Sequence, residues 1–168
     1  MCMDDSSLTF MEATRQDSQC IDHAARIWAQ AAAQRDHKPT PTDGSQALAG
    51  VQRRLALPEA RLVMASKDGV PAGFTIASPH DGYLEIYYVA VAPDFWGQGI
   101  ARVLLSEVDR HAASAGHVEL RLWVIADNSR AIELYLSCGY QHTGQELIDE
   151  TSGRIEFLLR KKLSREPG

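Results

Sequence analysis

The stretch from Leu84 to Leu105, LEIYYVAVAPDFWGQGIARVLL, decides the fold of this chain. Its opening segment, Leu84 to Val91, is aromatic and β-branched, which is typical of a buried strand. Pro93 and Asp94 end that strand, because proline cannot continue a ladder and aspartate favours turns. The stretch therefore predicts a strand, a glycine turn and a helix, whose apolar residues recur at helical spacing at Ile100, Val103, Leu104, Val108, Ala112 and Ala115.

The turn between strand and helix contains Gly97 and Gly99, and it indicates an anion-binding site. The first N–H groups of a helix have no intrahelical partner, and the helix dipole places partial positive charge beside them. Glycines let the backbone approach a ligand without interference from a Cβ atom. Arg102, on the first turn, could add a charge-assisted contact. This arrangement favours phosphate or diphosphate as the ligand.

Other interpretations of the glycine turn deserve comparison. A dinucleotide motif needs a third glycine where this chain has Arg102, and the preceding strands suggest an antiparallel meander. A Walker loop needs GxxxxGK followed by Ser or Thr, and the sequence has no such run. The glycines could also merely shape a tight connection, and the turn taken alone leaves that interpretation open.

The composition predicts one ordinary globular domain. The 168 residues are 45% apolar and 23% charged, within the normal range for such proteins. A net charge of -5 gives no support for general nucleic-acid binding, and no apolar run is long enough for a membrane helix. Cys2, Cys20 and Cys138 form no CxxC pair, and no apolar leader precedes them, so a cytoplasmic location is expected.

The order of predicted elements is strand, helix, helix, three strands, helix, strand, helix and two strands. It indicates a single α/β domain over residues 8–163, with a mixed, mostly antiparallel sheet of about seven strands. Residues 1–7 and 164–168 are expected to be disordered. Strands are predicted at 8–13, 61–66, 70–77, 84–91, 118–125, 140–147 and 154–161, helices at 18–34, 45–57, 100–115 and 130–137, and a turn at 79–82.

Two segments of the chain resemble the GNAT superfamily of acyl-coenzyme A-dependent N-acetyltransferases. The first is VAVAPDFWGQGIARVLL, and the family signature is (Gln/Arg)-x-x-Gly-x-(Gly/Ala). Gly99 and Ala101 match that signature, whereas Trp96 departs from its first position. The second segment is ADNSRAIELYLSCGYQHTG, and the resemblance covers roughly residues 60–161. This second motif matches at Asn128, Ala131, Tyr135, Gly139 and Tyr140.

The resemblance implies acetyl-coenzyme A as cosubstrate and no metal. In the family a bulge splays the central strand from its parallel neighbour, and the strand backbone, here Val89, Ala90 and Val91, holds pantetheine like an added strand. Asn128 would contact the coenzyme near the second wall of the slot, and it could equally be a helix N-cap. The turn would bind the diphosphate through Gly97, Gln98, Gly99, Ile100, Ala101 and Arg102.

The resemblance also implies catalytic roles. Tyr135, lining the coenzyme site, would protonate the departing thiolate, and a phenol with a pKa of about 10 suits that task. A packed helix tyrosine is the plain alternative. Glu85, on the central strand, is the candidate base that deprotonates the amine. Glu85 could instead be a solvated strand-end residue or bind a cationic substrate.

The acceptor side is expected from residues 18–57 and 141–157, together with the central strands. Members that acetylate ribosomal-protein N-termini often have a glutamate where this chain has Trp123, which suggests that Trp123 packs against the acceptor. Glu85, Tyr87 and Trp28 are the other predicted substrate-binding residues, and His80 or Asp81 could relay a proton through water. Cys138 is interpreted as buried rather than nucleophilic, which favours direct transfer in a ternary complex.

The sequence leaves the acceptor, the acyl group and a non-catalytic role open. The acceptor could be a small amine or a peptide, and the acyl group could be longer than acetyl. The domain could also bind acyl-coenzyme A as a non-catalytic sensor or regulatory module. Exposed edge strands in such folds often pair, so a homodimer is included among the partner predictions.

Overall fold

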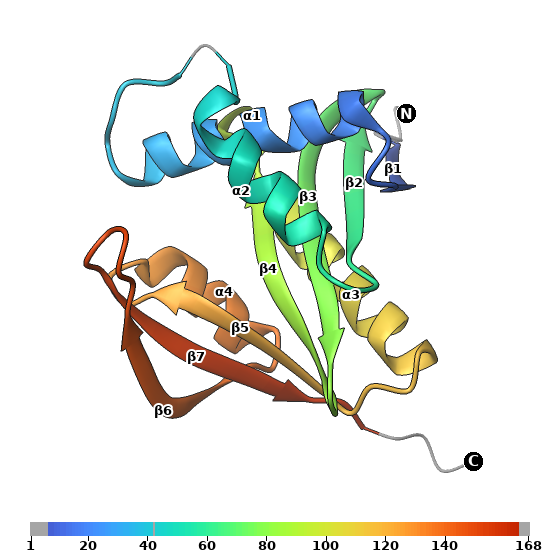
Figure 1. Ribbon diagram of the computed structural model, residues 1–168, viewed down its shortest axis with the longest axis vertical. Coiled ribbons are helices and arrows are strands. Elements are labelled where there is room, and N and C mark those ends of the chain that lie inside the picture. The colour runs from blue at the N-terminus through green and yellow to red at the C-terminus, as the bar shows by residue number, and fades with distance from the viewer. Residues whose placement is uncertain (1–6, 42, 165–168) are drawn as a thin grey trace, which may run out of the picture.

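The computed structural model describes residues 7–41 and 43–164. Most of the two segments predicted to be disordered, residues 1–6 and 165–168, lie outside the described residues, as does Cys2. The predicted order of strands and helices is confirmed (Figure 1). The elements are β1 (Leu8–Ala13), α1 (Ser18–Arg35), α2 (Ser45–Leu55), β2 (Arg61–Lys67), β3 (Val70–His80), β4 (Tyr83–Val91), η1 (Pro93–Phe95), α3 (Ile100–Ser114), β5 (Glu119–Ile125), α4 (Ser129–Ser137), β6 (Gln141–Ile148) and β7 (Ile155–Lys162).

The strands form a seven-stranded sheet in the order β1-β2-β3-β4-β5-β7-β6. Every neighbouring pair is antiparallel except β4 and β5, which are parallel, so the predicted mixed, mostly antiparallel sheet is confirmed. Helices α1 and α2 lie together over β2 to β4 and α3 lies behind the same strands, whereas α4 lies beside β5 (Figure 1). Buried residues of α1 and α2 and buried residues of α3 pack in separate clusters, as this arrangement requires.

A bulge in β4 determines where the sheet opens. The antiparallel register between β3 and β4 shifts from Ile76–Tyr88 to Ala77–Ile86, so Tyr87 is the extra residue. Ile86 packs in the cluster with α3, whereas Tyr88 packs in the cluster with α1 and α2, because the bulge changes the alternation of faces. The parallel pairing of β4 with β5 runs from Leu84–Leu120 to Ile86–Leu122. Beyond Ile86 these two fully described strands diverge.

Two element ends differ from the predictions by more than one residue. Helix α2 ends at Leu55, two residues before the predicted Leu57. Leu57 precedes Pro58, and the residue before a proline disfavours helical geometry. Strand β3 continues to His80 through the segment predicted as a turn, and Pro79 pairs with Leu84. Pro79 lies near the end of β3, where a missing N–H donor is tolerated, and the turn contracts to residues 81–82.

Candidate functional site

The edge of β4 that β5 leaves uncovered forms one wall of a slot. Ala92 N–H donates to Ala72 O across the β3 side at 2.8 Å. Because hydrogen-bonding directions alternate along an antiparallel pair, Val89 and Val91 direct their backbone N–H and C=O groups away from β3, toward the slot. The resulting row of backbone groups can accept an extended, amide-containing ligand as an added strand.

The glycine turn lies at the end of this wall. Gly97 and Gly99 have φ of +80° and +79°, in the left-handed region that favours glycine, and a Cβ atom at either would meet nothing within 4 Å. Gly99 is the N-cap of α3, no side chain caps the helix, and its first turn contains no acidic residue. The first N–H groups of α3 therefore face open space beside a positive dipole end, which suits an anion.

The start of α4 forms the opposite wall. Asn128 Oδ1 accepts a hydrogen bond from Ala131 N–H at 3.3 Å, so Asn128 is the N-cap of α4, the structural role that the sequence had left open. Tyr135, two turns further on, is buried. Burial raises the pKa of its hydroxyl well above the ordinary tyrosine value, and the nearby Cys138 adds to the rise. Tyr135 therefore keeps its proton at any physiological pH.

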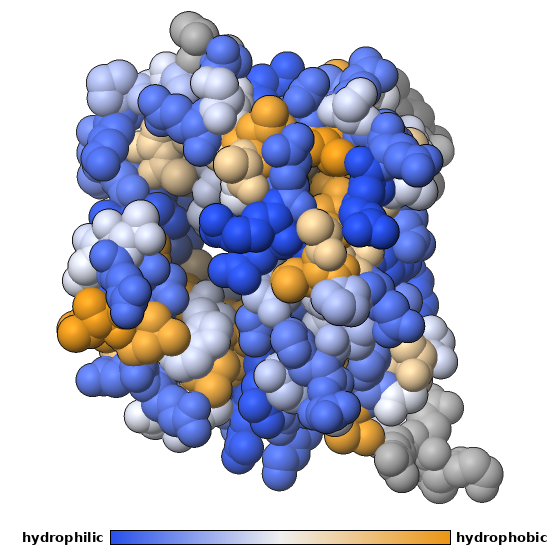
Figure 2. All heavy atoms as spheres, in the orientation of Figure 1, coloured by the Kyte–Doolittle hydropathy of each residue, from blue (hydrophilic) through white to orange (hydrophobic). Residues whose placement is uncertain are grey.

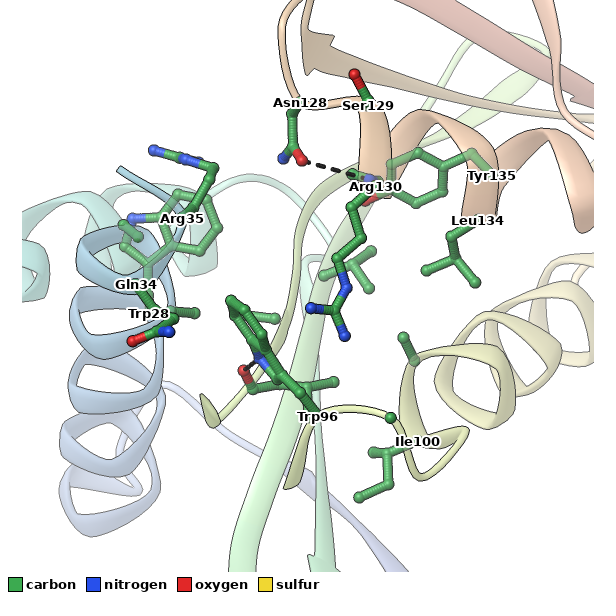
Figure 3. A pocket seen from close by; sticks show the side chains of 18 of the residues that line it. Trp28, Gln34, Arg35, Trp96, Ile100, Asn128, Ser129, Arg130, Leu134 and Tyr135 are labelled. Carbon is green, nitrogen blue, oxygen red and sulfur yellow. Dashed lines mark hydrogen bonds between the residues drawn. The ribbon is translucent and has the colours of Figure 1, made fainter. Parts of the chain in front are cut away.

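These walls enclose a cavity of about 1030 Å³ (Figure 3). Figure 2 shows the molecular face hollowed between the α1–α2 side and the β6–β7 side. Gln98 does not line the cavity, because its side chain turns away and accepts a hydrogen bond from Lys67 Nζ. The other residues predicted to bind the cofactor all line it, namely Val89, Ala90, Val91, Gly97, Gly99, Ile100, Ala101, Arg102, Asn128 and Tyr135.

The residues predicted to bind the acceptor are divided. Trp28 lines the cavity and meets Tyr88 edge to face, with ring centroids 4.9 Å apart. Glu85, Tyr87 and Trp123 do not line it. Glu85 lies in the short paired region of β4 and β5, before the strands diverge. The structure therefore does not bring Glu85 and Tyr135 into a single enclosed cavity.

Tyr87 lies in a polar group of its own. Its hydroxyl is 2.8 Å from His80 Nε2, and the Arg54 guanidinium lies 4.6 Å from its ring centroid. Burial raises the pKa of Tyr87 to about 12, with the negative charge of Glu85 as the next cause. Asp81, the other predicted relay residue, is exposed in the turn after β3.

Sequence reasoning missed a carboxylate on β7. Glu156 pairs with Ile125 of β5 and therefore shares the sheet face that carries Trp123. Burial raises the pKa of Glu156, Asp149 raises it further, and Arg54 acts in the opposite direction. The alternation of side chains along the predicted strand specified the face on which Glu156 lies. No local pattern indicated that Trp123 shares this face.

An ion cluster at the cavity rim was also missed. Asp36, at the end of α1, accepts from Arg35 Nε and Nη2, each at 3.1 Å. Arg154, from the β6–β7 connection, donates to both oxygens of Asp36 at 3.3 and 3.0 Å. The hydrogen bond from Arg35 is the first cause that lowers the pKa of Asp36, to about 2. The cluster joins segments 118 residues apart, which no local pattern indicates.

Neither a cluster of metal ligands nor a membrane-spanning helix occurs in the part of the chain that the structure describes. Within residues 7–41 and 43–164, no group of three or more His, Cys, Asp or Glu side chains is placed to hold a metal ion. No described helix combines the length and the apolar character needed to cross a membrane.

Known acetyltransferases share the sequence profile and the fold of this chain. The profile of the Acetyltransferase (GNAT) family matches residues 20–140. The ribosomal-protein-S18-alanine N-acetyltransferase of Escherichia coli has a TM-score of 0.71 at 20% identity, over 96% of this chain and 97% of that one. The PaiA N-acetyltransferase of Thermoplasma acidophilum, solved with coenzyme A, gives 0.66 at 18%, over 93% and 99%. An aminoglycoside 6′-N-acetyltransferase complexed with coenzyme A gives 0.72 at 16%, over 95% and 99%. At such identities the likeness to solved structures shows a shared fold.

Proposed function

The chain belongs to the acetyltransferase (GNAT) family, and from that premise we propose that it transfers an acetyl group from acetyl-coenzyme A to a primary amine by direct attack in a ternary complex. One observation carries the proposal. A single cavity is lined by the uncovered backbone of β4, by the glycine turn before α3 and by the buried hydroxyl-bearing residue Tyr135. These are the features that a long ligand with amides, a diphosphate and a leaving thiolate would need.

The residues present fit the coenzyme as cosubstrate. The N–H and C=O of Val89 and the N–H of Val91 would hold the pantetheine amides, and the turn from Gly97 to Arg102 would bind the diphosphate. Asn128 would lie beside the pantetheine while capping α4. The coenzyme supplies the reactive thioester, so the chain itself must supply position and proton transfer.

Proton transfer would require two groups, a base for the attacking amine and an acid for the leaving thiolate. As the amine nitrogen forms its bond to the acetyl carbon, a base, for which we retain Glu85, takes the ammonium proton. As the carbon–sulfur bond breaks, Tyr135 donates its phenolic proton to the thiolate. A buried, fully protonated phenol suits the second task. Because Glu85 lies outside the cavity, the proposal requires that the acceptor, or a water, bridges from Glu85 to the thioester.

The acceptor would enter from the α1 and β6–β7 side, past Trp28, Tyr87 and Trp123. Two solved relatives are named for amines of different kinds, the alanine of ribosomal protein S18 and the 6′-amine of an aminoglycoside. The aromatic side chains here, with the carboxylates of Glu85 and Glu156, favour a cationic amine attached to an apolar or ring-bearing group.

The proposal is tested by calorimetry with acetyl-coenzyme A, followed by thiol release across a panel of amines. The expected result is binding below millimolar ligand and release of coenzyme A with at least one amine class. Absence of binding at millimolar ligand would overturn the proposal. Binding without thiol release across the panel would instead support a sensor that holds acyl-coenzyme A. Repeating the donor assay with longer acyl chains defines the acyl group, and light scattering tests the homodimer prediction.

A further inference from the structure

The indole ring of Trp96 and the guanidinium of Arg130 meet across the slot. Arg130 Cζ lies 4.5 Å from the ring centroid of Trp96. Trp96 belongs to the turn before α3 and Arg130 to the first turn of α4, so the contact joins the two walls of the cavity. Figure 3 shows Arg130 extending from α4 toward Trp96.

The position of Trp96 is fixed by a second contact. Trp96 Nε1 donates to Val91 O at 2.6 Å, on the edge of β4 that faces the slot. The indole is therefore held against the strand while its ring remains open to Arg130. The same hydrogen bond occupies the Val91 carbonyl, which leaves Val89 and the Val91 N–H as the slot-facing backbone groups for a ligand.

The charges lining the cavity are unevenly neutralised. Arg35 and Arg154 share the carboxylate of Asp36 at the rim. Arg102 and Arg130 also line the cavity, but neither has a carboxylate partner among the described residues. Neither α3 nor α4 has an acidic residue in its first turn. Asp127 also lines the cavity, but it forms no ion pair with Arg102 or Arg130. The two guanidinium groups near the glycine turn are therefore not held by any carboxylate of the described chain.

We propose that Arg130, held on the ring of Trp96, binds the phosphate groups of the coenzyme, and that Trp96 is its positioning residue. This inference rests on the proposed function. An aromatic ring attracts a guanidinium without neutralising it, so Arg130 is oriented and can still donate to a phosphate. Trp96 stands where the family signature has Gln or Arg. In this chain a polar group for the phosphates is supplied instead from the facing helix.

The test measures binding of coenzyme A, dephospho-coenzyme A and pantetheine by titration, so that no readout depends on turnover. Arg130→Ala should weaken coenzyme A by about 10- to 100-fold, the loss typical of a charge-assisted hydrogen bond. The affinity for dephospho-coenzyme A, which keeps the diphosphate, should fall by the same factor, and the affinity for pantetheine should be unchanged. Arg110→Ala removes another exposed arginine with no carboxylate partner, on α3 outside the cavity, and it should leave all three affinities unchanged.

The role of Trp96 is tested by Trp96→Leu, Trp96→Phe and the double variant with Arg130→Ala. Trp96→Leu should lose most of the affinity that Arg130→Ala loses, and Trp96→Phe should lose less because it keeps a ring. In the double variant the losses should not add, since both act through one contact. Fully additive losses would overturn the positioning role of Trp96.

The other outcomes are decisive as well. A loss confined to coenzyme A would place Arg130 on the 3′-phosphate rather than the diphosphate. Equal loss with pantetheine would overturn the inference, because the variant would then have changed the shape of the slot. Wild-type affinity in Arg130→Ala would overturn this inference alone, whereas a wild-type chain that binds none of the ligands would overturn the proposed function.

Discussion

The rings of Tyr135 and Tyr140 meet edge to face, with centroids 5.8 Å apart and an interplanar angle of 64°. Both side chains are buried, and both hydroxyls have pKa values raised mainly by burial. Their positions relative to the cavity differ, because Tyr135 lines it and Tyr140 does not. A single aromatic contact therefore joins a phenol that faces the cavity, for which we propose the catalytic role, to one that only packs.

Tyr135→Phe should lower kcat by about 100-fold while the affinity for acetyl-coenzyme A changes little, because the variant keeps the packed ring and removes only the proton donor. Steady-state kinetics and calorimetry measure the two quantities separately. The raised pKa of Tyr135 also means that the hydroxyl of the wild-type enzyme should cause no loss of rate as the pH rises to about 10, where an ordinary tyrosine is half ionised. Unchanged kcat in the variant would remove Tyr135 from the mechanism.

Tyr140→Phe is the matched control. Tyr140 Oη is buried and has no hydrogen-bond partner among the described residues, so its removal leaves no group unpaired. We expect wild-type kcat and a free energy of unfolding that is unchanged or raised by up to about 1 kcal/mol. A fall in kcat comparable to that of Tyr135→Phe would mean that the aromatic packing, rather than the Tyr135 hydroxyl, sustains turnover.

Glu85→Gln should remove the acidic limb of the pH profile of kcat/KM, because glutamine cannot take the ammonium proton. Glu156→Gln is the control that the structure demands, since burial raises the pKa of Glu156 toward the range in which a base works. Profiles of both variants, measured with the same amine, identify the base. If the limb persists in Glu85→Gln and disappears in Glu156→Gln, the role belongs to Glu156.

Asp36→Asn should make stability less dependent on pH in the acid range. The pKa of Asp36 in the folded chain is lowered to about 2, below that of about 3.9 in an unfolded chain. The ionised carboxylate therefore favours folding above about pH 4, and this contribution is lost as the pH falls toward 2. Allowing for solvent screening at the cavity rim, we expect the variant to be less stable by roughly 1 kcal/mol at neutral pH.

Urea unfolding from about pH 2 to pH 7 measures this effect. The difference between wild type and Asp36→Asn should shrink as the acid limit is approached. Asp81→Asn, in an exposed turn, is the control and should follow the wild type throughout. A constant difference at every pH would show that the Arg35–Asp36–Arg154 cluster does not depend on the ionised carboxylate.

Features carried by local sequence were predictable. The strand ending at Val91, the glycine turn and the Asn128 cap each depend on neighbouring residues, and the structure places their predicted elements along one cavity. A bulge in the central strand was expected only through the family resemblance, and its position at Tyr87 comes from the structure, because the strand residues themselves do not indicate an extra residue. Pro79 shows the opposite error, since a residue typical of turns is accommodated near the end of a strand.

Contacts between distant segments were not predictable. The periodicity of a strand or helix specifies the face on which a residue lies, but not which residue of another element it meets. The Asp36–Arg154 pair depends on how α1 meets the β6–β7 connection, and the Trp96–Arg130 contact depends on how the glycine turn meets α4. For the same reason the sequence could place Glu85 on the central strand without showing that it lies outside the cavity.

Gly97→Ala should weaken acetyl-coenzyme A binding by at least about 10-fold, beyond its effect on stability. The φ of Gly97 is +80°, so alanine strains the backbone by about 1 kcal/mol, and its Cβ would project into open space where we propose that the diphosphate binds. Gly69→Ala is closely matched, because Gly69 has a φ of +82° and equally open surroundings in the turn between β2 and β3. Urea unfolding should show similar losses for both variants, whereas calorimetry should show lost affinity for Gly97→Ala alone. Equal affinities would mean that the backbone of this turn does not contact the diphosphate, and that the α3 site must be sought further along the helix.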